Sequence, residues 1–441
     1  MTLTSELKKS CAQVLTTLEE RYAYSQDAGN VSGGGLADAV VFVENVEQIQ
    51  EVVRIANKYK TPIICRGAGT NVVGACVPVN GGIVLNFCKM NKILEINAEN
   101  MSVRVQPGVI VGDLHKAVEA VGLFYPPDPS ALAVSTIGGS IAQASAGAKT
   151  FKYGTTKDYV LALTIVTASG EILHTGSNTI KNATGYNLSS LFVGSEGTLG
   201  IVAEAVLKLI PKPQSRQVVM AYFDTVEAAV NTVNKIISHR MFPSTIDFMD
   251  KTAMQIVGIS CDKESALIIE VEEDLSKTLD VLENAADVQY SKNEEEYEKI
   301  WAARRASMAA CAQLKPNVTT DDVTVPRQNL AKLVKGIQAI CAKYDLICCL
   351  IGHVGDGSVH PQIPIDFRDE DEYARYKLAK NEIYELTASL DGVLSGEHGI
   401  GLLKREHIGK VVDPLALQYM REIKKVFDPN NILNPDKIFI Y

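Results

Sequence analysis

Three of the chain's seven histidines stand in two short, glycine-punctuated segments that also carry acidic residues. These segments are His353-Val-Gly-Asp-Gly-Ser-Val-His360 and Gly396-Glu397-His398-Gly399. Imidazole nitrogens and carboxylate oxygens are ligands that Fe, Zn and Mn ions accept in proteins. The pattern therefore indicates a site in which the two histidines of the first segment and Glu397 bind one divalent ion, while His398 remains as a base.

The residues around the first segment predict a β-hairpin. Residues 346–352 form an apolar run typical of a strand, Gly355-Asp356-Gly357 is strong turn chemistry, and residues 358–365 can return as the second arm. If His353 faces Ser358 across a loop of about four residues, the two-residue period of a strand puts His360 on the same face. The hairpin would then bring His353 and His360 close enough to share an ion.

Each of these features has an ordinary explanation when it is taken alone. A single histidine is more often a core or surface residue than a ligand, and Gly-Asp-Gly is a common hairpin turn. The combination of two histidines at hairpin spacing with Glu397-His398 is what favours a metal site over a structural one.

A second candidate site is the loop of small residues from Arg66 to Gly74. It reads Arg66-Gly67-Ala68-Gly69-Thr70-Asn71-Val-Val-Gly74 and follows the predicted strand 62–65. Small residues let backbone N–H groups approach phosphate oxygens closely. The loop does not match the dinucleotide fingerprint, because its third glycine comes two residues late and Pro78 and Gly81-Gly82 follow where a helix should run. We therefore expect a phosphate-cradling loop that differs from a Rossmann turn.

Length and composition restrict the protein class. A chain of 441 residues is expected to form two or three domains. Its 46% hydrophobic and 22% charged residues are ordinary for a globular protein, and a net charge of −9 argues against nucleic-acid binding. No apolar window reaches the length of a membrane span, and residues 2–21 predict an amphipathic helix rather than a signal peptide. We expect a cytoplasmic protein.

The nine cysteines include no Cys-x-x-Cys spacing, so we expect reduced thiols and no iron–sulfur cluster in this chain.

The hydrophobic pattern changes near Lys212-Pro213. Before it, strands are predicted at 39–43, 62–65, 83–87, 93–96, 102–105 and 158–168, with helices at 46–59 and 111–121. A long irregular segment, rich in glycine and serine, covers residues 125–147, and such loops are usually functional. After it, strands at 217–223 and 266–271 alternate with helices at 226–238 and 275–285. Residues 214–390 therefore predict an α+β cap with an antiparallel sheet.

Several ordered motifs carry a family resemblance. They are Arg-Gly-Ala-Gly-Thr at 66–70, Pro-Pro-Asp-Pro at 126–129, Thr-Ile-Gly-Gly at 136–139, Lys-Tyr-Gly at 152–154 and Val-Gly-Ser-Glu-Gly-Thr-Leu-Gly-Ile at 193–201. The chain resembles the FAD-binding vanillyl-alcohol oxidase/p-cresol methylhydroxylase superfamily. Within it, the chain is similar to the branch that holds glycolate oxidase catalytic subunits and the D-lactate and D-2-hydroxyglutarate dehydrogenases.

The resemblance implies an α+β fold with a two-part FAD-binding domain of the p-cresol methylhydroxylase type. The expected division is a helical segment at 1–35, the FAD-binding domain at 36–213, the cap at 214–390 and a C-terminal segment at 391–441 that returns to the flavin. FAD would be bound non-covalently, because the loops expected to contact it, at 66–71, 135–147 and 200–201, contain no histidine. The implied FAD contacts are Arg66, Gly67, Ala68, Gly69, Thr70, Asn71, Asp128, Ser135, Thr136, Gly139, Ser145, Gly200, Ile201 and Asn434.

The resemblance also implies a reaction. Metal-dependent relatives have ligands at the His353, His360 and Glu397 positions, a base at the His398 position and an arginine at the Arg304 position that holds the substrate carboxylate. The implied chemistry is oxidation of a D-2-hydroxy acid to the 2-oxo acid, with proton removal by His398 and hydride transfer to the flavin.

Other positions depart from the family pattern and bear on the substrate. Ser358 stands where relatives usually have asparagine, and Asp436 where they have glycine. A lysine that grips the second carboxylate of hydroxyglutarate is missing near Thr320. This favours D-lactate first and glycolate next, with D-2-hydroxyglutarate as an alternative.

The reduced flavin needs an electron acceptor that the sequence does not name. An electron-transfer flavoprotein or a separate iron–sulfur subunit is favoured, and direct reaction with oxygen stays open. Other classes also stay open: a flavin-binding, non-catalytic subunit of a larger oxidase, a flavin-free metal hydrolase and an ether-lipid synthase. The intact histidine segments speak against a scaffold, and the 66–71 and 194–201 loops would be superfluous in a hydrolase.

Overall fold

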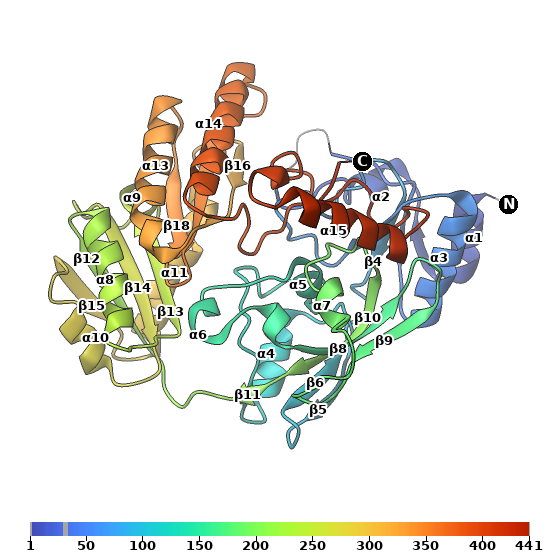
Figure 1. Ribbon diagram of the computed structural model, residues 1–441, viewed down its shortest axis with the longest axis horizontal. Helices are drawn as coiled ribbons and strands as arrows, with labels where there is room; N and C mark the ends of the chain where they lie inside the picture. The colour runs from blue at the N-terminus through green and yellow to red at the C-terminus, as the bar shows by residue number, and fades with distance from the viewer. Residues whose placement is uncertain (1, 30–33, 441) are drawn as a thin grey trace. The chain divides into compact units, whose positions relative to one another are not determined.

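A computed structural model describes residues 2–29 and 34–440 (Figure 1). Residues 1 and 30–33 of the predicted N-terminal segment, and residue 441 of the predicted C-terminal one, lie outside these described residues. The chain forms two compact units. The first comprises residues up to Ala146, Thr155–Lys212 and the chain from Glu397 onward, and the second comprises Gly147–Gly154 and Pro213–Gly396.

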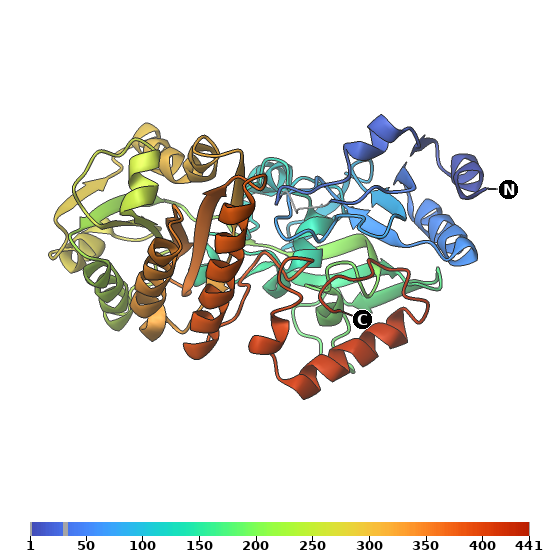
Figure 2. The same cartoon turned by 90° about the horizontal axis from the view of Figure 1, so that it is seen from above.

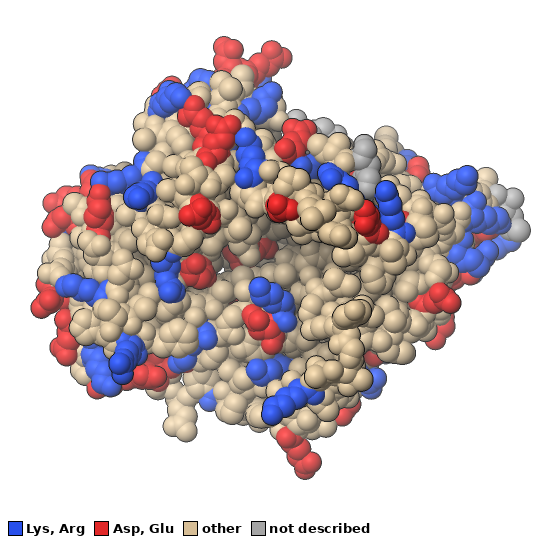
Figure 3. Space-filling view, in the orientation of Figure 1, with Lys and Arg blue, Asp and Glu red and all other residues tan. Residues whose placement is uncertain are grey.

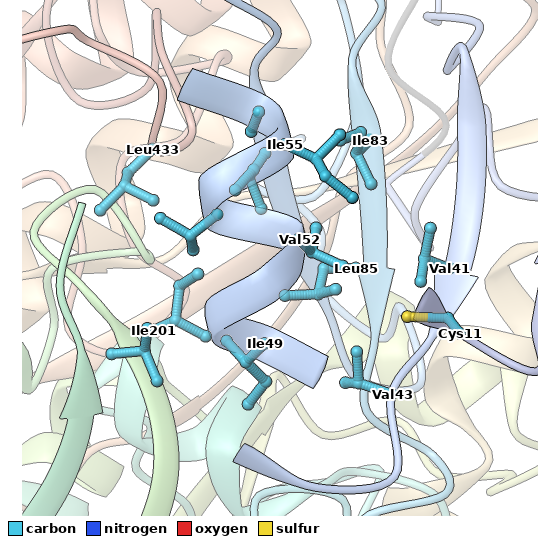
Figure 4. Close-up of a cluster of buried hydrophobic side chains, with 14 of the residues drawn as sticks. Cys11, Val41, Val43, Ile49, Val52, Ile55, Ile83, Leu85, Ile201 and Leu433 are labelled. Carbon is cyan, nitrogen blue, oxygen red and sulfur yellow. The ribbon is translucent and has the colours of Figure 1, made fainter. Parts of the chain in front are cut away.

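The first unit begins with a four-stranded sheet. Its order is β1 (Gln13–Leu15), β2 (Ala39–Phe42), β4 (Ile83–Asn86) and β3 (Ile63–Arg66). Strands β2, β4 and β3 are parallel, as expected for strands joined through a helix, here α3 (Val46–Tyr59). The apolar face of α3, with Ile49, Val52 and Ile55, packs on Ile83 and Leu85 of β4 in one buried cluster (Figure 4).

A five-stranded antiparallel sheet completes this unit. Its order is β5 (Ile93–Asn97), β6 (Ser102–Val105), β10 (Ile201–Lys208), β8 (Val160–Val166) and β9 (Ile172–Gly176). Every second residue of β10 is buried, as the two-residue period of a strand requires. The other elements are α1 (Leu3–Ser10), α2 (Leu18–Tyr22), α4 (Val111–Glu119), β7 (Leu123–Phe124), α5 (Ile137–Gln143), α7 (Ser189–Phe192), β11 (Ile210–Pro211) and α15 (Pro414–Phe427).

The second unit is built on an eight-stranded sheet whose paired strands, among the described residues, are antiparallel. Along the sheet lie β15 (Asp287–Tyr290), β12 (Gln217–Phe223), β14 (Ser265–Val271), β13 (Thr245–Asp250), β18 (Cys349–His353), β19 (Ser358–Ile365) and β16 (Asn317–Thr320), and β17 (Val323–Thr324) pairs with β19. Figure 2 shows α13 (Leu330–Lys343) and α14 (Glu370–Ser389) side by side. The other helices are α6 (Thr150–Tyr153), α8 (Val226–Ser238), α9 (Lys251–Ile256), α10 (Leu275–Val281), α11 (Glu294–Arg305) and α12 (Ser307–Cys311).

This architecture confirms the predicted α+β fold, with a cap built on an antiparallel sheet. Two local predictions were wrong. The first concerns residues 2–21, which form α1, β1 and α2 instead of one helix. Gln13 pairs with Phe42, so the edge of β2 satisfies its backbone groups by taking up an extra strand, and this pairing overrides the local helical pattern.

The second wrong prediction concerns residues 125–147, which contain the short helix α5 in the segment expected to be irregular. The Thr136 side chain accepts the N–H of Gly139 and caps this helix. Two consecutive glycines, Gly138 and Gly139, lower the intrinsic helix propensity and hide the helix from sequence reasoning.

No helix in the two described ranges combines the length and the apolarity that a membrane crossing needs. On the face shown in Figure 3, acidic and basic side chains are intermixed.

A buried lysine ties the C-terminal segment to the first unit. Lys424 of α15 pairs with Asp428 and donates to the carbonyl oxygens of Thr198 and Leu433, at 2.8 Å each. The segment that holds Asn434 is thereby fixed to the loop that precedes β10.

Replacing Lys424 with methionine should lower the free energy of unfolding of the first unit by about 3–5 kcal/mol, because the Asp428 carboxylate stays buried after losing its cation. The exposed neighbour provides the control: Lys425→Met should change the free energy by less than about 0.5 kcal/mol. Urea unfolding followed by flavin fluorescence measures both. Equal midpoints for the two variants would contradict the assignment.

Candidate functional site

The two histidines of the predicted metal site come together on the hairpin of β18 and β19. Ile351 pairs with His360, so His353, two residues beyond Ile351, points to the same face as His360. The ring centroids are 5.0 Å apart with the planes at 75°, and both side chains are buried. The predicted hairpin geometry is confirmed.

A buried carboxylate orients the first histidine. Asp247 of β13 pairs with His353 across the sheet, and its Oδ1 lies 2.5 Å from His353 Nδ1. An Nδ1–H donor to this carboxylate puts the lone pair of the ring on Nε2, the nitrogen that a metal would take. Burial alone would raise the pKa of the Asp247 carboxyl group, but the Arg304 charge and the hydrogen bond from His353 hold that pKa below its usual value. Asp247 is therefore an anion in this site.

The same carboxylate binds the predicted substrate arginine. Arg304 lies near the end of α11, is buried, and places its Nε 2.6 Å from Asp247 Oδ2. One aspartate thus joins the arginine to the histidine. Because one edge of the guanidinium group is held in this way, the direction of the group is fixed.

A second carboxylate faces the second histidine. Asp322 Oδ1 lies 3.6 Å from His360 Nδ1, and Asp322 Oδ2 accepts a hydrogen bond from Ser395 Oγ at 2.9 Å. Ser358, at the start of β19, donates through its hydroxyl group to Asp356 Oδ1 at 2.6 Å and closes the hairpin loop. A carboxylate thus lies near the Nδ1 atom of each predicted imidazole ligand, within hydrogen-bond distance for His353 and at 3.6 Å for His360.

Glu397 directly follows Gly396, the last residue of the second unit. His353 and His360 each offer a ring nitrogen, and Glu397 carries the carboxylate that the sequence predicts as the third ligand. A Cβ at position 396 would meet Thr324 Oγ1 at 2.7 Å, so only glycine lets the chain pass here. Two imidazoles and one carboxylate fit a divalent Fe, Zn or Mn ion with positions left for substrate oxygens. His398 Nε2 lies 3.8 Å from Glu397 Oε1.

In the first unit, the predicted phosphate loop meets the start of α5. Thr70 Oγ1 lies 3.4 Å from Ser135 Oγ. A Cβ on Gly67 would lie 2.1 Å from Thr136 Oγ1, so this close approach requires glycine. Asn434, at the far end of the chain, donates through Nδ2 to the carbonyl oxygen of Ala75 at 2.9 Å. The structure thus brings predicted cofactor residues from three distant segments into the first unit.

Some predicted cofactor residues use their side chains elsewhere. Arg66 donates through Nη1 to the carbonyl oxygen of Gln26 at 2.7 Å. Ile201 is fully buried in the apolar cluster of Figure 4, and a Cβ on Gly200 would lie 2.5 Å from Ile165 Cγ2. Both Gly200 and Ile201 therefore offer only their backbone to a ligand.

The remaining members of the predicted cofactor set lie around α5. Ser145 Oγ is 3.3 Å from Thr156 Oγ1. The N–H of Gly139 donates to Thr136 Oγ1, which caps the helix. Asp128 lies in the irregular stretch before the helix.

Sequence reasoning missed the two carboxylates behind the histidines, Asp247 and Asp322. The available signal was a charged residue inside an apolar strand: Asp247 stands between Ile246 and Phe248 in a strand that is buried throughout. A carboxylate in such a place requires a partner, because burying an unpaired charge is costly.

Two family models match the chain. The model of the FAD binding domain matches residues 37–176, and the model of the FAD linked oxidases, C-terminal domain, matches residues 212–438. The chain is 42% identical to the glycolate oxidase subunit GlcD of Bacillus subtilis, over 95% of this chain and 92% of that one. It is 32% identical to a D-lactate dehydrogenase of Anaerostipes hadrus, over 97% and 94%.

A solved structure of p-cresol methylhydroxylase superimposes with a TM-score of 0.83 over 99% of this chain and 96% of that one, at 18% sequence identity, and so shares the fold. Because both family models match in order, one of them over more than half of the chain, the chain belongs to the FAD-linked oxidase family and is a flavoprotein oxidoreductase with an FAD-binding domain.

Proposed function

We propose that the protein oxidises a short D-2-hydroxy acid to the 2-oxo acid, with D-lactate as the first candidate and glycolate as the second. The observation that carries this proposal is the buried pair His353 and His360, each facing a carboxylate, in a chain of the FAD-linked oxidase family that continues into Glu397 and His398. The names of the relatives, a glycolate oxidase subunit and a D-lactate dehydrogenase, support the same substrate class.

His353, His360 and Glu397 would hold a divalent ion of Fe, Zn or Mn. When bound, such an ion supplies Lewis acidity that lowers the pKa of a hydroxyl group, and FAD supplies the hydride acceptor. Other residues of the chain orient these ligands. Asp247 sets the tautomer and ring direction of His353, and Asp322 faces the Nδ1 atom of His360.

Arg304 and His398 divide the remaining work. The guanidinium group of Arg304, held at Nε by Asp247, binds the substrate carboxylate, which fixes the direction of the hydroxyl carbon. His398 accepts the hydroxyl proton at a ring nitrogen as the bond from hydrogen to carbon breaks. The 66–71 loop and the start of α5 would bind the phosphate groups of the cofactor.

The residues around β16 favour a monocarboxylate over a dicarboxylate. Neither β16 nor β17 contains a lysine. Two lysines near them already face acids of the chain: Lys315 pairs with Glu372, and Lys380 Nζ lies 3.9 Å from Asp321 Oδ2. A second substrate carboxylate would therefore lack an obvious cation, which places D-2-hydroxyglutarate behind D-lactate and glycolate.

The electron acceptor is proposed to be a partner protein, either an electron-transfer flavoprotein or an iron–sulfur subunit. The described cysteines are free thiols, and no group of three or more of them forms a cluster site among the described residues. Electrons therefore need a carrier outside this chain, or oxygen itself.

Anaerobic addition of D-lactate to the purified flavoprotein should bleach the oxidised flavin absorbance, whereas L-lactate should leave it unchanged. Glycolate should bleach it more slowly, and D-2-hydroxyglutarate least of all, because neither β16 nor β17 contains a lysine for its second carboxylate. An oxidised spectrum with all four acids would refute the proposed activity and favour a non-catalytic flavin subunit.

Changing Asp247 to asparagine should weaken metal binding by about 10- to 100-fold, because His353 loses the carboxylate that orients its ring and makes its Nε2 atom more basic. Competition with a fluorescent chelator measures the affinity without any turnover. The matched control is Asp250→Asn in the same buried strand, since Asp250 accepts the N–H groups of Ala253 and Leu350 and the side-chain amide of Gln338, and bonds to neither histidine. Equal metal affinity of the two variants would contradict the orienting role.

A further inference from the structure

The segment Glu397–Gly401, which carries the proposed base, is gripped by a single carboxylate of the first unit. Glu196 Oε1 accepts the N–H of Ile400 at 2.7 Å, and Glu196 Oε2 accepts the N–H of Gly401 at 2.9 Å. Hydrogen bonds from backbone N–H groups to a carboxylate are about twice as strong as neutral ones. Because the two bonds leave from opposite oxygens of one planar group, they fix the direction of the chain directly after His398.

Glu196 is itself held rigidly. Its backbone N–H donates to the carbonyl oxygen of Ala142 at 2.8 Å, and its own carbonyl oxygen accepts Asn434 Nδ2 at 2.7 Å. Its φ of 53° lies in the left-handed region, which is strained for a residue with a side chain. Such strain persists only where surrounding contacts enforce it, and it gathers at functional sites. The side chain of Glu196 is therefore aimed by its backbone rather than by chance packing.

Position 399 allows only glycine beside this carboxylate. Its φ is 85°, and a Cβ there would lie 2.9 Å from Glu196 Oε1 and 2.3 Å from Gln143 Oε1. A glycine is required for both reasons, the backbone conformation and the close approach. The segment that carries the base is thus built around Glu196.

A second contact holds the other side of the same segment. Asn71, from the predicted phosphate loop, donates through Nδ2 to the carbonyl oxygen of His398 at 3.1 Å. Its Oδ1 accepts the N–H groups of Val73 and Ala75, at 2.9 and 3.0 Å. The main chain of His398 is therefore fixed on its carbonyl side by Asn71 and beyond Gly399 by Glu196.

The carboxylate occupies this place at a cost. It is 4% exposed, and burial raises the pKa of Glu196 to about 7, against the opposing effect of the two backbone donors and of the buried Lys437 and Lys404. A glutamine would be cheaper to bury at this position but has one acceptor oxygen instead of two.

We propose that Glu196 is a positioning residue for the proton-transfer step: its two carboxylate oxygens clamp the N–H groups of Ile400 and Gly401 and so hold His398 and Glu397 in their working places. This inference rests on the proposed function of His398 and Glu397. It adds a residue that acts through the segment that it holds.

The test compares Glu196→Gln with wild-type holoprotein in two measurements. In the first, flavin reduction by D-lactate is followed in a stopped-flow instrument: the limiting rate should fall about 10- to 100-fold, while FAD content and the half-saturating D-lactate concentration change less than about twofold. In the second, amide hydrogen exchange over residues 397–403 should become at least about tenfold faster without substrate.

Glu270→Gln provides the matched control. Glu270 is also buried, and its carboxylate accepts hydrogen bonds from Tyr297 and Ser244 in the second unit. This variant suffers the same chemical change and should leave both readouts near wild type. If Glu196→Gln does not fold, Glu196→Asp replaces it; its shorter side chain can reach only one N–H group, and the same two changes are expected.

An unchanged reduction rate, or a loss of rate that Glu270→Gln reproduces, would overturn the positioning role. Unchanged exchange in residues 397–403 would overturn the clamp itself. A wild-type flavin that D-lactate, glycolate and D-2-hydroxyglutarate all leave oxidised would instead reject the proposed function. The exchange measurement then decides on the clamp alone, because it requires no substrate.

Discussion

The bridge from Asp247 to His353 and Arg304 is the interaction on which the second unit's chemistry depends. One buried aspartate contacts an imidazole through Oδ1 and a guanidinium group through Oδ2. A carboxylate with 1% exposure is stable only when it is paired, and the Arg304 cation together with the Nδ1–H group of His353 provides that pairing. The same pairing fixes a candidate metal ligand relative to a candidate substrate anchor, so a structural requirement and a functional one are met by the same atoms.

The hairpin of β18 and β19 could be predicted because its information is local. The alternation of a strand and the Gly-Asp-Gly turn set which residues face each other, and Ile351 pairs with His360 as that pattern requires. The pairing of β13 with β18 is a different matter. It joins Asp247 to His353 across a long stretch of sequence, and no local periodicity specifies which strands become neighbours. The sequence shows a charged Asp247 inside an apolar strand, which indicates that it needs a partner, but it does not show that this partner is His353.

The N-terminal residues and α5 show that a local sequence pattern can also predict the wrong element. The amphipathic pattern of residues 2–21 is real, yet the unsatisfied edge of β2 recruits Gln13–Leu15 as a strand. At α5, a threonine cap outweighs the poor propensity of two glycines. In both places a contact with residues elsewhere in the fold, or a side-chain cap, decides the local structure.

The loops of the first unit are held by the same kind of hydrogen bond. Carboxylate and amide side chains bind backbone N–H and carbonyl groups of neighbouring loops, as Glu196 does for Ile400 and Gly401 and Asn71 does for His398. Irregular backbone needs such partners, because its polar groups lack the pairing that strands and helices provide. A chain that must place a base and a cofactor loop precisely enough for chemistry gains positional order from these bonds without regular structure.

The most direct test of the central claim, a divalent ion held by His353, His360 and Glu397, is anomalous X-ray diffraction from crystals of the metal-replete protein, recorded on both sides of the absorption edge of the metal found in the sample. The account predicts one peak per chain, in contact with these three side chains. A map without a peak at these residues, from protein that still oxidises D-lactate in the presence of a chelator, would contradict it.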